Sequence, residues 1–227
     1  MDVQILHFFN GSNNILLDQM AVLLTSGWTW IPLYLVLFYI VMRNNETMMQ
    51  ITLAVMGALV CVALADGITD GIVKPLVARW RPNNDPLLKY TFHVMDGMRG
   101  KGFSFFSAHA ANTMSVAVFL SLMTRSTKLS VTLVAWSLIN CWTRLYLAMH
   151  YPSDILCGLL CGAAVGVLVY MLYLRLYRAV SPHIKYISDQ YTSTGYEHAD
   201  INMAVIVMLL TLIYSVLRGL LEVACWE

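Results

Sequence analysis

The stretch TRLYLAMHYPSD, residues 143–154, decides how the rest of the chain is read. It places Arg144, His150 and Asp154 beside long apolar segments. A charged group in hydrocarbon costs on the order of 2.5–3.5 kcal/mol on membrane-insertion scales, so ionisable residues at a membrane indicate a functional site. His150 and Asp154 are four residues apart, so they share a helical face and can stay neighbours across the break at Pro152.

The three side chains fit two interpretations. A carboxylate bonded to one imidazole nitrogen fixes the tautomer and leaves the other nitrogen to act as a base or nucleophile. The planar guanidinium of Arg144 suits a phosphate group. In the structural alternative, Asp154 only stabilises the first turn of the next helix and His150 lies at a polar interface.

The composition indicates a membrane protein. Of the 227 residues, 59% are hydrophobic and only 12% are charged, and the apolar residues form long uncharged runs. The net charge of +1 gives no general attraction to nucleic acid. The first basic residue is Arg43, so we expect no cleaved signal peptide. We interpret the cysteines as packing residues: Cys61, Cys141, Cys157, Cys161 and Cys225.

We therefore predict an all-α fold, a polytopic transmembrane helix bundle that forms a single domain over residues 1–227. Residues 1–27 are expected to form an interfacial helix or a partial hairpin, and 181–200 a polar linker. About six spans are expected, at residues 28–42, 48–73, 108–124, 129–147, 155–174 and, as an additional C-terminal span, 201–217.

Two features of these spans bear on packing. The long loop 75–106, between spans two and three, contains aromatic residues that favour an ordered cap outside the membrane. In the fifth span Gly158, Gly162 and Gly166 recur every four residues, which favours close helix packing.

A charged stripe closes the second span. Asp66, Asp70 and Lys74 follow one another at intervals of four residues, so they share a helical face, which we expect to point into the bundle. The stripe is either a buried ion pair that joins helices or a support that holds Lys74 at a site.

The basic residues give an orientation. If every span crosses, one side carries Arg43, Arg125, Lys128, Arg175, Arg178 and Lys185, and that side should be cytoplasmic. The candidate site residues then all fall at the outer face of the cytoplasmic membrane, and this convergence of distant polar segments favours a functional site.

Three segments resemble the signature of the type 2 phosphatidic acid phosphatase superfamily. KPLVARWRP (74–82) is similar to its K-x6-R-P motif, FSAH (106–109) resembles P-S-G-H, and Thr143-Arg144-x5-His150-x3-Asp154 resembles S-R-x5-H-x3-D. The order and spacing agree over the motif core 74–154. The departures are Phe106 for proline, Ala108 for glycine and Thr143 for serine, and none removes an ionisable group.

The resemblance implies a role for each matching residue. His150 would attack phosphorus and carry a phosphohistidine, Asp154 would orient it, and His109 would protonate the leaving oxygen and then activate water. The phosphoryl oxygens would be held by Lys74, Arg81, Ser107, Ala108 and Arg144. Asp70 does not belong to the motifs, and its supporting role is predicted from the charged stripe. No further histidine shows a partner pattern, so we interpret these as surface or interface residues: His7, His93, His183 and His198.

The expected substrate is a lipid phosphate, and no metal, other cofactor or nucleic acid is expected. Undecaprenyl diphosphate, phosphatidylglycerol phosphate, phosphatidic acid and lipid A phosphates all remain candidates. One alternative is a transporter or anion-binding membrane protein without turnover, although no internal repeat supports it. Another is a vanadate-dependent haloperoxidase, a family with a similar anion site whose known members are soluble.

Overall fold

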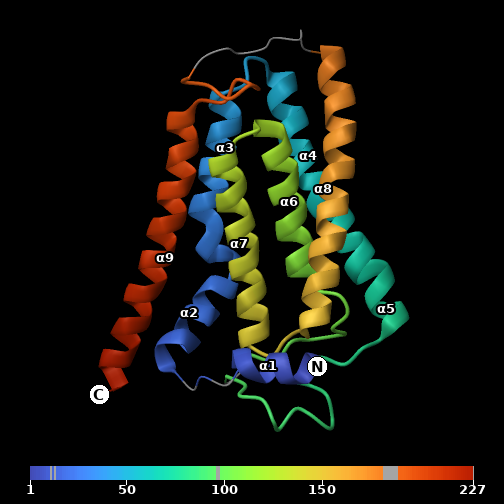
Figure 1. Cartoon of the computed structure of the whole chain (residues 1–227), viewed down its shortest axis with the longest axis vertical. Coiled ribbons are helices and arrows are strands. Elements are labelled where there is room, and N and C mark those ends of the chain that lie inside the picture. Colours follow the sequence, from blue (N-terminus) through green and yellow to red (C-terminus); the bar gives the residue numbers. More distant parts are fainter. Residues whose placement is uncertain (11, 13, 96–97, 181–188, 227) are drawn as a thin grey trace.

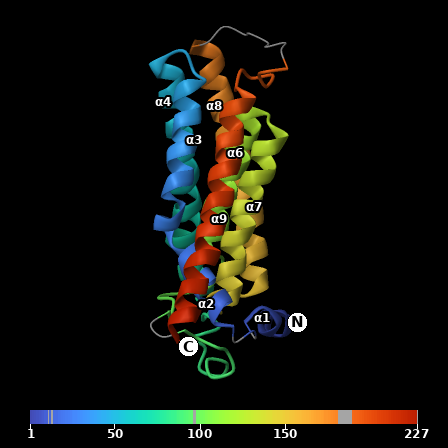
Figure 2. The ribbon, with the colours of Figure 1, turned by 90° about the vertical axis from the view of Figure 1, so that its left-hand side faces the viewer.

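The computed structural model describes residues 1–10, 12, 14–95, 98–180 and 189–226. Lys185, His183 and the first part of the expected 181–200 linker lie outside the described residues. Within the described part of the chain, no strand is present and six helices run side by side along the long axis (Figures 1 and 2). They are α3 (Ile31–Arg43), α4 (Met48–Asp66), α6 (Ala108–Thr124), α7 (Thr127–Tyr146), α8 (Pro152–Val180) and α9 (His198–Trp226). The predicted all-α bundle is confirmed.

Shorter segments complete one end of the bundle. Helix α1 (Asp2–Asn10) lies across this end, and α2 (Ile15–Thr25) leads through a single turn, η1 (Gly27–Trp30), into α3 with a bend of 72° (Figure 1). Residues 1–27 thus form short helices, and whether they lie at the interface, as expected, or α2 joins α3 in one bent span stays a prediction. At the same end α4 continues through a π-helical segment, η2 (Gly67–Val73), into α5 (Lys74–Val77), which tilts away from the bundle.

Local sequence fixes the helix boundaries. The Thr47 side chain accepts from the Gln50 N–H while the Gln50 side chain accepts from the Thr47 N–H, a reciprocal cap that starts α4. Ser126 caps α7 with a single side-chain bond, by accepting from the Leu129 N–H. Pro152 occupies the first position of α8, where its missing N–H is tolerated.

Length and apolar composition alone identify fewer candidate spans than the six expected. Among the described helices, three are long and apolar enough to cross a membrane: Met48–Val77, Pro152–Val180 and His198–Ala224. A fourth is added if the bent pair Ile15–Thr25 and Gly27–Arg43 crosses as one span, so this criterion does not reach the six expected.

The shortfall arises in the two central helices, α6 and α7. Helix α6 has only 17 residues, and both helices carry buried polar side chains, among which Thr113 and Ser137 share a hydrogen bond of 2.7 Å. Most side chains of α6 and α7 are buried or half-buried, so few of their residues need to face lipid. Burial therefore allows them the polar groups that lower their hydropathy.

The two ends of the bundle differ in character. The α3–α4 and α6–α7 turns and the C-terminal end of α8 lie at one end, and these carry basic residues (Figure 1). At the opposite end lie α1, α5, the loop that follows α5, the start of α6 and the α7–α8 connection. The loop is bound to that connection, since the Asn83 N–H donates to the Ala148 carbonyl at 3.2 Å.

Glycines allow α8 to lie against α6, as the sequence predicts. A Cβ atom at Gly158 would lie 2.7 Å from the Ser107 carbonyl oxygen, and one at Gly166 would lie 2.5 Å from that of Ser115. Real Cβ atoms do not approach so closely, so a larger residue would push the helices apart. This contact sets the distance between the two helices that begin at the polar end.

We expect Gly166→Ala to destabilise the protein by about 1–3 kcal/mol, the usual cost of overpacking. Gly67→Ala is the matched control, because a Cβ there meets nothing within 4 Å. Thermal unfolding in detergent checks both variants. Equal unfolding temperatures for the two would contradict the close α6–α8 contact.

Candidate active site

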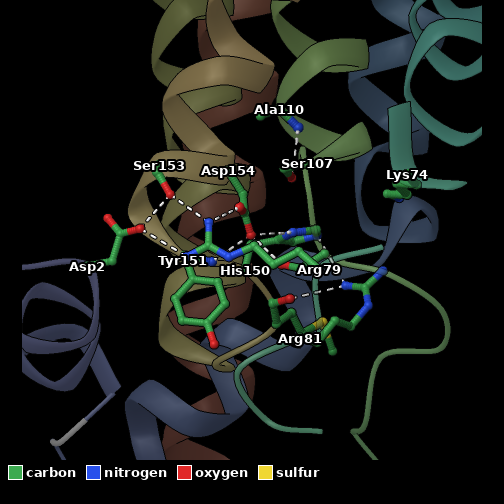
Figure 3. Close-up of polar contacts among 12 residues, drawn as sticks. Asp2, Lys74, Arg79, Arg81, Ser107, Ala110, His150, Tyr151, Ser153 and Asp154 are labelled. Atoms are coloured by element: carbon green, nitrogen blue, oxygen red, sulfur yellow. Dashed lines mark hydrogen bonds and ion pairs between the residues drawn. The ribbon is translucent and has the colours of Figure 1, made fainter. Parts of the chain in front are cut away.

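The α7–α8 connection brings a histidine and an aspartate together at the polar end of the bundle (Figure 3). Asp154 lies in the first turn of α8, and its Oδ2 is 3.6 Å from Nδ1 of His150. Both side chains are buried, with exposed fractions of 2% for His150 and 0% for Asp154. The sequence spacing thus does place the two groups side by side.

Asp154 is held by donors from three directions. Its Oδ1 accepts from Nη1 of Arg79 at 2.8 Å, and its Oδ2 accepts from the Tyr151 N–H at 2.9 Å and from the Ser104 hydroxyl. A buried carboxylate needs such partners, because desolvation of an unpaired charge costs several kcal/mol. The carboxylate is therefore fixed before any substrate binds.

The other nitrogen of His150 faces a guanidinium. Nη1 of Arg81 lies 3.2 Å from Nε2, and since arginine can only donate, Nε2 carries the lone pair and Nδ1 the proton. Burial, above all, lowers the pKa of His150 to about 4; the charges of Arg81 and Lys74 act in the same direction, and Asp154 opposes them. The imidazole is therefore neutral near pH 7, with its lone pair available on Nε2.

The loop holds Arg81 in place. Its Nε donates to the Lys101 carbonyl at 3.0 Å and its Nη1 to the Met149 carbonyl at 3.2 Å. A Cβ at Gly100 would lie 2.7 Å from Cδ of Arg81, so this position must stay small. The predicted cap over the site is thus present and positions one of its cations.

Arg144 is a buried cation without a counter-ion among the described residues. It is 8% exposed, Nη1 donates to Sδ of Met149 at 3.1 Å, and Nη2 donates to the Thr25 carbonyl at 3.2 Å. Its Nε has no partner within the part of the chain that the structure describes. An uncompensated buried guanidinium is costly alone and favours an arriving anion.

The start of α6 supplies further donors. Ser107 caps the helix by accepting from the Ala110 N–H at 3.4 Å, and the Ser107 N–H donates to the Asp154 carbonyl at 3.1 Å (Figure 3). Ala108 and His109 follow in the first turn, where backbone N–H groups have no acceptor within the helix. These N–H groups can donate hydrogen bonds to a bound anion.

The stripe that closes the second span is only partly as predicted. Asp66 accepts from Nδ2 of Asn112 at 2.6 Å, and Lys74 pairs with Asp70 at 2.6 Å. The Lys74 side chain is 12% exposed, but that of Asp70 is 58% exposed, so the expectation that the whole stripe points into the bundle is wrong. The π-helical turn through Gly67–Val73 has more residues per turn than an α-helix, which rotates Asp70 outward.

A cavity of about 550 Å³ opens beside this polar end. Its walls come from α3, α4, α6 and α7 and are mainly apolar, with His109 and Asn112 among the few polar side chains. His109 and Leu120 both line it and are eleven residues apart on α6, a distance of about 16 Å at ~1.5 Å per residue. That length is close to one leaflet, which is half of a hydrocarbon core of about 30 Å.

Sequence reasoning missed four residues at this site: Asp2, Arg79, Ser104 and Ser153. Arg79 lies within the first matching motif but not at one of its fixed positions. Ser104 belongs to an irregular loop, and Asp2 is separated from Asp154 by the whole motif core. No helical or strand periodicity connects these positions, so their contacts follow from the tertiary fold alone.

Several other described histidines and cysteines have neighbours of their own. His7 stacks on Phe92 and His93 lies 3.5 Å from Asp18, and both histidines are exposed, in agreement with their interpretation as surface residues. Cys61, Cys141, Cys157 and Cys161 are free thiols, as predicted, and the Cys225 side chain lies outside the description. No group of three or more metal-ligating His, Cys, Asp or Glu side chains occurs among the described residues.

Comparison with known proteins agrees with this geometry. A lipid A 4'-phosphatase of Bacteroides thetaiotaomicron is 36% identical over 160 residues, which cover 70% of each chain. A lipid A 4'-phosphatase of Porphyromonas gingivalis is 30% identical over 153 residues, 66% of this chain and 63% of that one. The crystal structure of Aquifex aeolicus LpxE is similar in fold, with a TM-score of 0.54 at 20% identity over 74% of this chain and 94% of the other.

The family profile covers the whole motif core. It matches residues 54–178 and therefore contains all three segments that bring the polar residues together. The chain belongs to the PAP2 superfamily.

Proposed function

We propose that this membrane protein is a phosphatase that hydrolyses a lipid phosphate through a phosphohistidine on His150. The observation that carries the proposal is the buried imidazole of His150, with Nδ1 toward Asp154 and Nε2 toward the cation Arg81. Substrate binding would draw Arg81 from Nε2 to the phosphoryl oxygens and free the lone pair for attack. Residues 1–227 would form one phosphatase domain.

The proposed reaction has two steps. Nε2 of His150 forms a bond to phosphorus while the bond to the lipid oxygen breaks, and His109 donates a proton to that oxygen. His109 then removes a proton from water, which attacks phosphorus and breaks the P–N bond to release phosphate. In both steps Asp154 would accept a hydrogen bond from the Nδ1–H of His150. Its negative charge would stabilise the positive charge that the phosphorylated ring carries.

Charge on the phosphoryl group would be met by the surrounding donors. Arg144 is already buried without a counter-ion, and Arg81 is within reach of the nucleophile. Lys74, the Ser107 hydroxyl and the Ala108 N–H would complete the set, with Lys74 turning from Asp70 to the substrate. Such preorganised donors supply electrostatic stabilisation without a metal ion.

The apolar cavity supports an amphiphilic substrate. It begins at His109, the proposed acid, and has the length of one leaflet, so an acyl chain could lie in it while the phosphate reaches His150. The relatives named lipid A 4'-phosphatase make a lipid A phosphate the first substrate to try. The other substrates to assay are undecaprenyl diphosphate, phosphatidylglycerol phosphate and phosphatidic acid.

We expect His150→Ala to lower phosphate release to less than about one-hundredth of wild type, since losing a nucleophile normally costs far more than that. His198→Ala, at the opposite end of the bundle, is the matched control. Purified protein is assayed on the four lipid phosphates, with and without chelator. Turnover that survives in His150→Ala would reject the nucleophile, loss with chelator would reject metal-independent catalysis, and phosphate binding without release would favour the anion-binding alternative.

Asp70→Asn should reduce turnover per folded molecule severalfold, because Lys74 would lose the anion that positions it in the empty site. Stability should change by less than about 1 kcal/mol, since the pair is largely exposed on the Asp70 side. Glu46→Gln, an exposed acid before α4, is the control. A destabilised Asp70→Asn variant with normal turnover would show that the Asp70–Lys74 ion pair has only a structural role.

We propose that the protein lies in the cytoplasmic membrane with its active site outside, because the basic turns occupy the other end. Cysteine at position 99, in the loop over the site, should then react with an impermeant thiol reagent added to intact cells. Cysteine at position 128, in the first turn of α7, should react only after permeabilisation. Both positions are exposed, so the reverse pattern would place the site in the cytoplasm.

A further inference from the structure

Arg79 differs from the other arginines of the site in what its guanidinium binds (Figure 3). Nη1 donates to Oδ1 of Asp154 and to Oγ of Ser153, both at 2.8 Å, and Nη2 donates to Oδ2 of Asp2 at 3.1 Å. Its planar face lies over the Tyr151 ring, with Cζ 3.8 Å from the ring centroid. Carboxylates occupy both ends of the guanidinium, so it has little capacity left for a phosphate.

We propose that Arg79, held by Asp2 of helix α1, is a positioning residue that fixes Asp154 for the reaction of His150. This role rests on the proposed function, because it concerns the orientation of the same nucleophile.

The argument begins with the freedom of the Asp154 side chain. Tyr151 N–H and the Ser104 hydroxyl both donate to Oδ2, the oxygen that also faces His150. Only Arg79 holds Oδ1 among the described contacts, and it therefore sets the rotation of the carboxylate plane. Without it, Oδ2 could turn away from Nδ1, which it already faces at the long distance of 3.6 Å.

Asp2 in turn holds Arg79. Its Oδ2 accepts from Nη2 of Arg79 and from the Ser153 hydroxyl, the latter at 2.5 Å. Ser153 also accepts from Nη1 of the same arginine. Asp2, Ser153 and Arg79 therefore form a closed set of hydrogen bonds that links α1, the loop and the start of α8. Side-chain exposure rises outward along this chain of contacts, from 0% at Asp154 to 31% at Arg79 and 34% at Asp2.

The charges of this cluster explain why a second carboxylate is useful. Arg79 alone would neutralise Asp154 and weaken its attraction for the positive imidazolium of the intermediate. Asp2 shares the arginine, so the three groups together keep one net negative charge next to His150. The arrangement fixes Asp154 without removing its electrostatic effect on the ring.

The test is a set of kinetic measurements on the full-length protein in detergent micelles with a lipid phosphate that wild type hydrolyses. Arg79→Gln should lower kcat by about tenfold to a hundredfold, the size of effect that a displacement near 1 Å produces, while KM stays within about twofold. Arg79→Lys should recover part of the loss, since it restores the charge but not the planar fork. Asp2→Asn should lower kcat by about threefold to tenfold, because it acts one contact farther out.

Epistasis separates positioning from a general effect on folding. In an Asp154→Asn background, Arg79→Gln should cost less than about twofold, since the group through which it acts is already changed. Arg99→Gln is the matched control, because this arginine of the same loop donates to the Asn83 carbonyl and does not touch Asp154.

Each contrary result has a distinct meaning. Normal kcat per folded molecule in Arg79→Gln, or a full multiplicative loss in the Asp154→Asn background, would overturn the proposal. If Arg79→Gln does not fold, the surface variant Asp2→Asn decides, and normal kcat there would overturn it equally. Wild-type protein that releases no phosphate from any lipid in the panel would reject the proposed function and this role with it.

Discussion

Burial of the Asp154 carboxylate is the constraint on which the polar end of this bundle depends. A fully buried anion is tolerated only with good donors, and here they come from the loop after α5 and from the α7–α8 connection. Asp2 of α1 joins this cluster by accepting from Arg79. The Ser107 N–H adds the start of α6 by binding the Asp154 carbonyl. One acidic residue thus brings together segments that are far apart in the sequence.

The four cations around Asp154 differ in the groups that they bind. Arg79 is satisfied by two carboxylates, and Lys74 is paired with Asp70. Arg81 lies against Nε2 of His150, the proposed nucleophile, and Arg144 is buried with no carboxylate among the described residues. In the proposed mechanism, a phosphate would therefore meet one cation that lacks a counter-ion and a second beside Nε2 of His150, while Arg79 stays with Asp154. Under this account, Arg144 and Arg81 bind the phosphate, whereas Arg79 orients Asp154.

Much of this could be predicted from the sequence, because motif spacing and hydropathy are local. The spacing of His150 and Asp154 predicts their contact, and the glycines of α8 predict its close approach to α6. The outward turn of Asp70 could not be predicted, since a π-helical segment has no simple signature. The contacts of Asp2 and Ser104 with the site depend on tertiary folding, and the polar residues of α6 and α7 are explained only by the burial of these helices.

The central claim is that His150 carries the phosphoryl group during turnover. The most direct measurement is to quench the enzyme in alkali during hydrolysis of a lipid phosphate labelled in its phosphate, conditions under which a P–N bond persists. The protein is then digested, and the labelled peptide is identified by mass spectrometry. The account predicts label on His150 in wild type and none in His150→Gln. Label on another residue, or sustained turnover by His150→Gln, would contradict it.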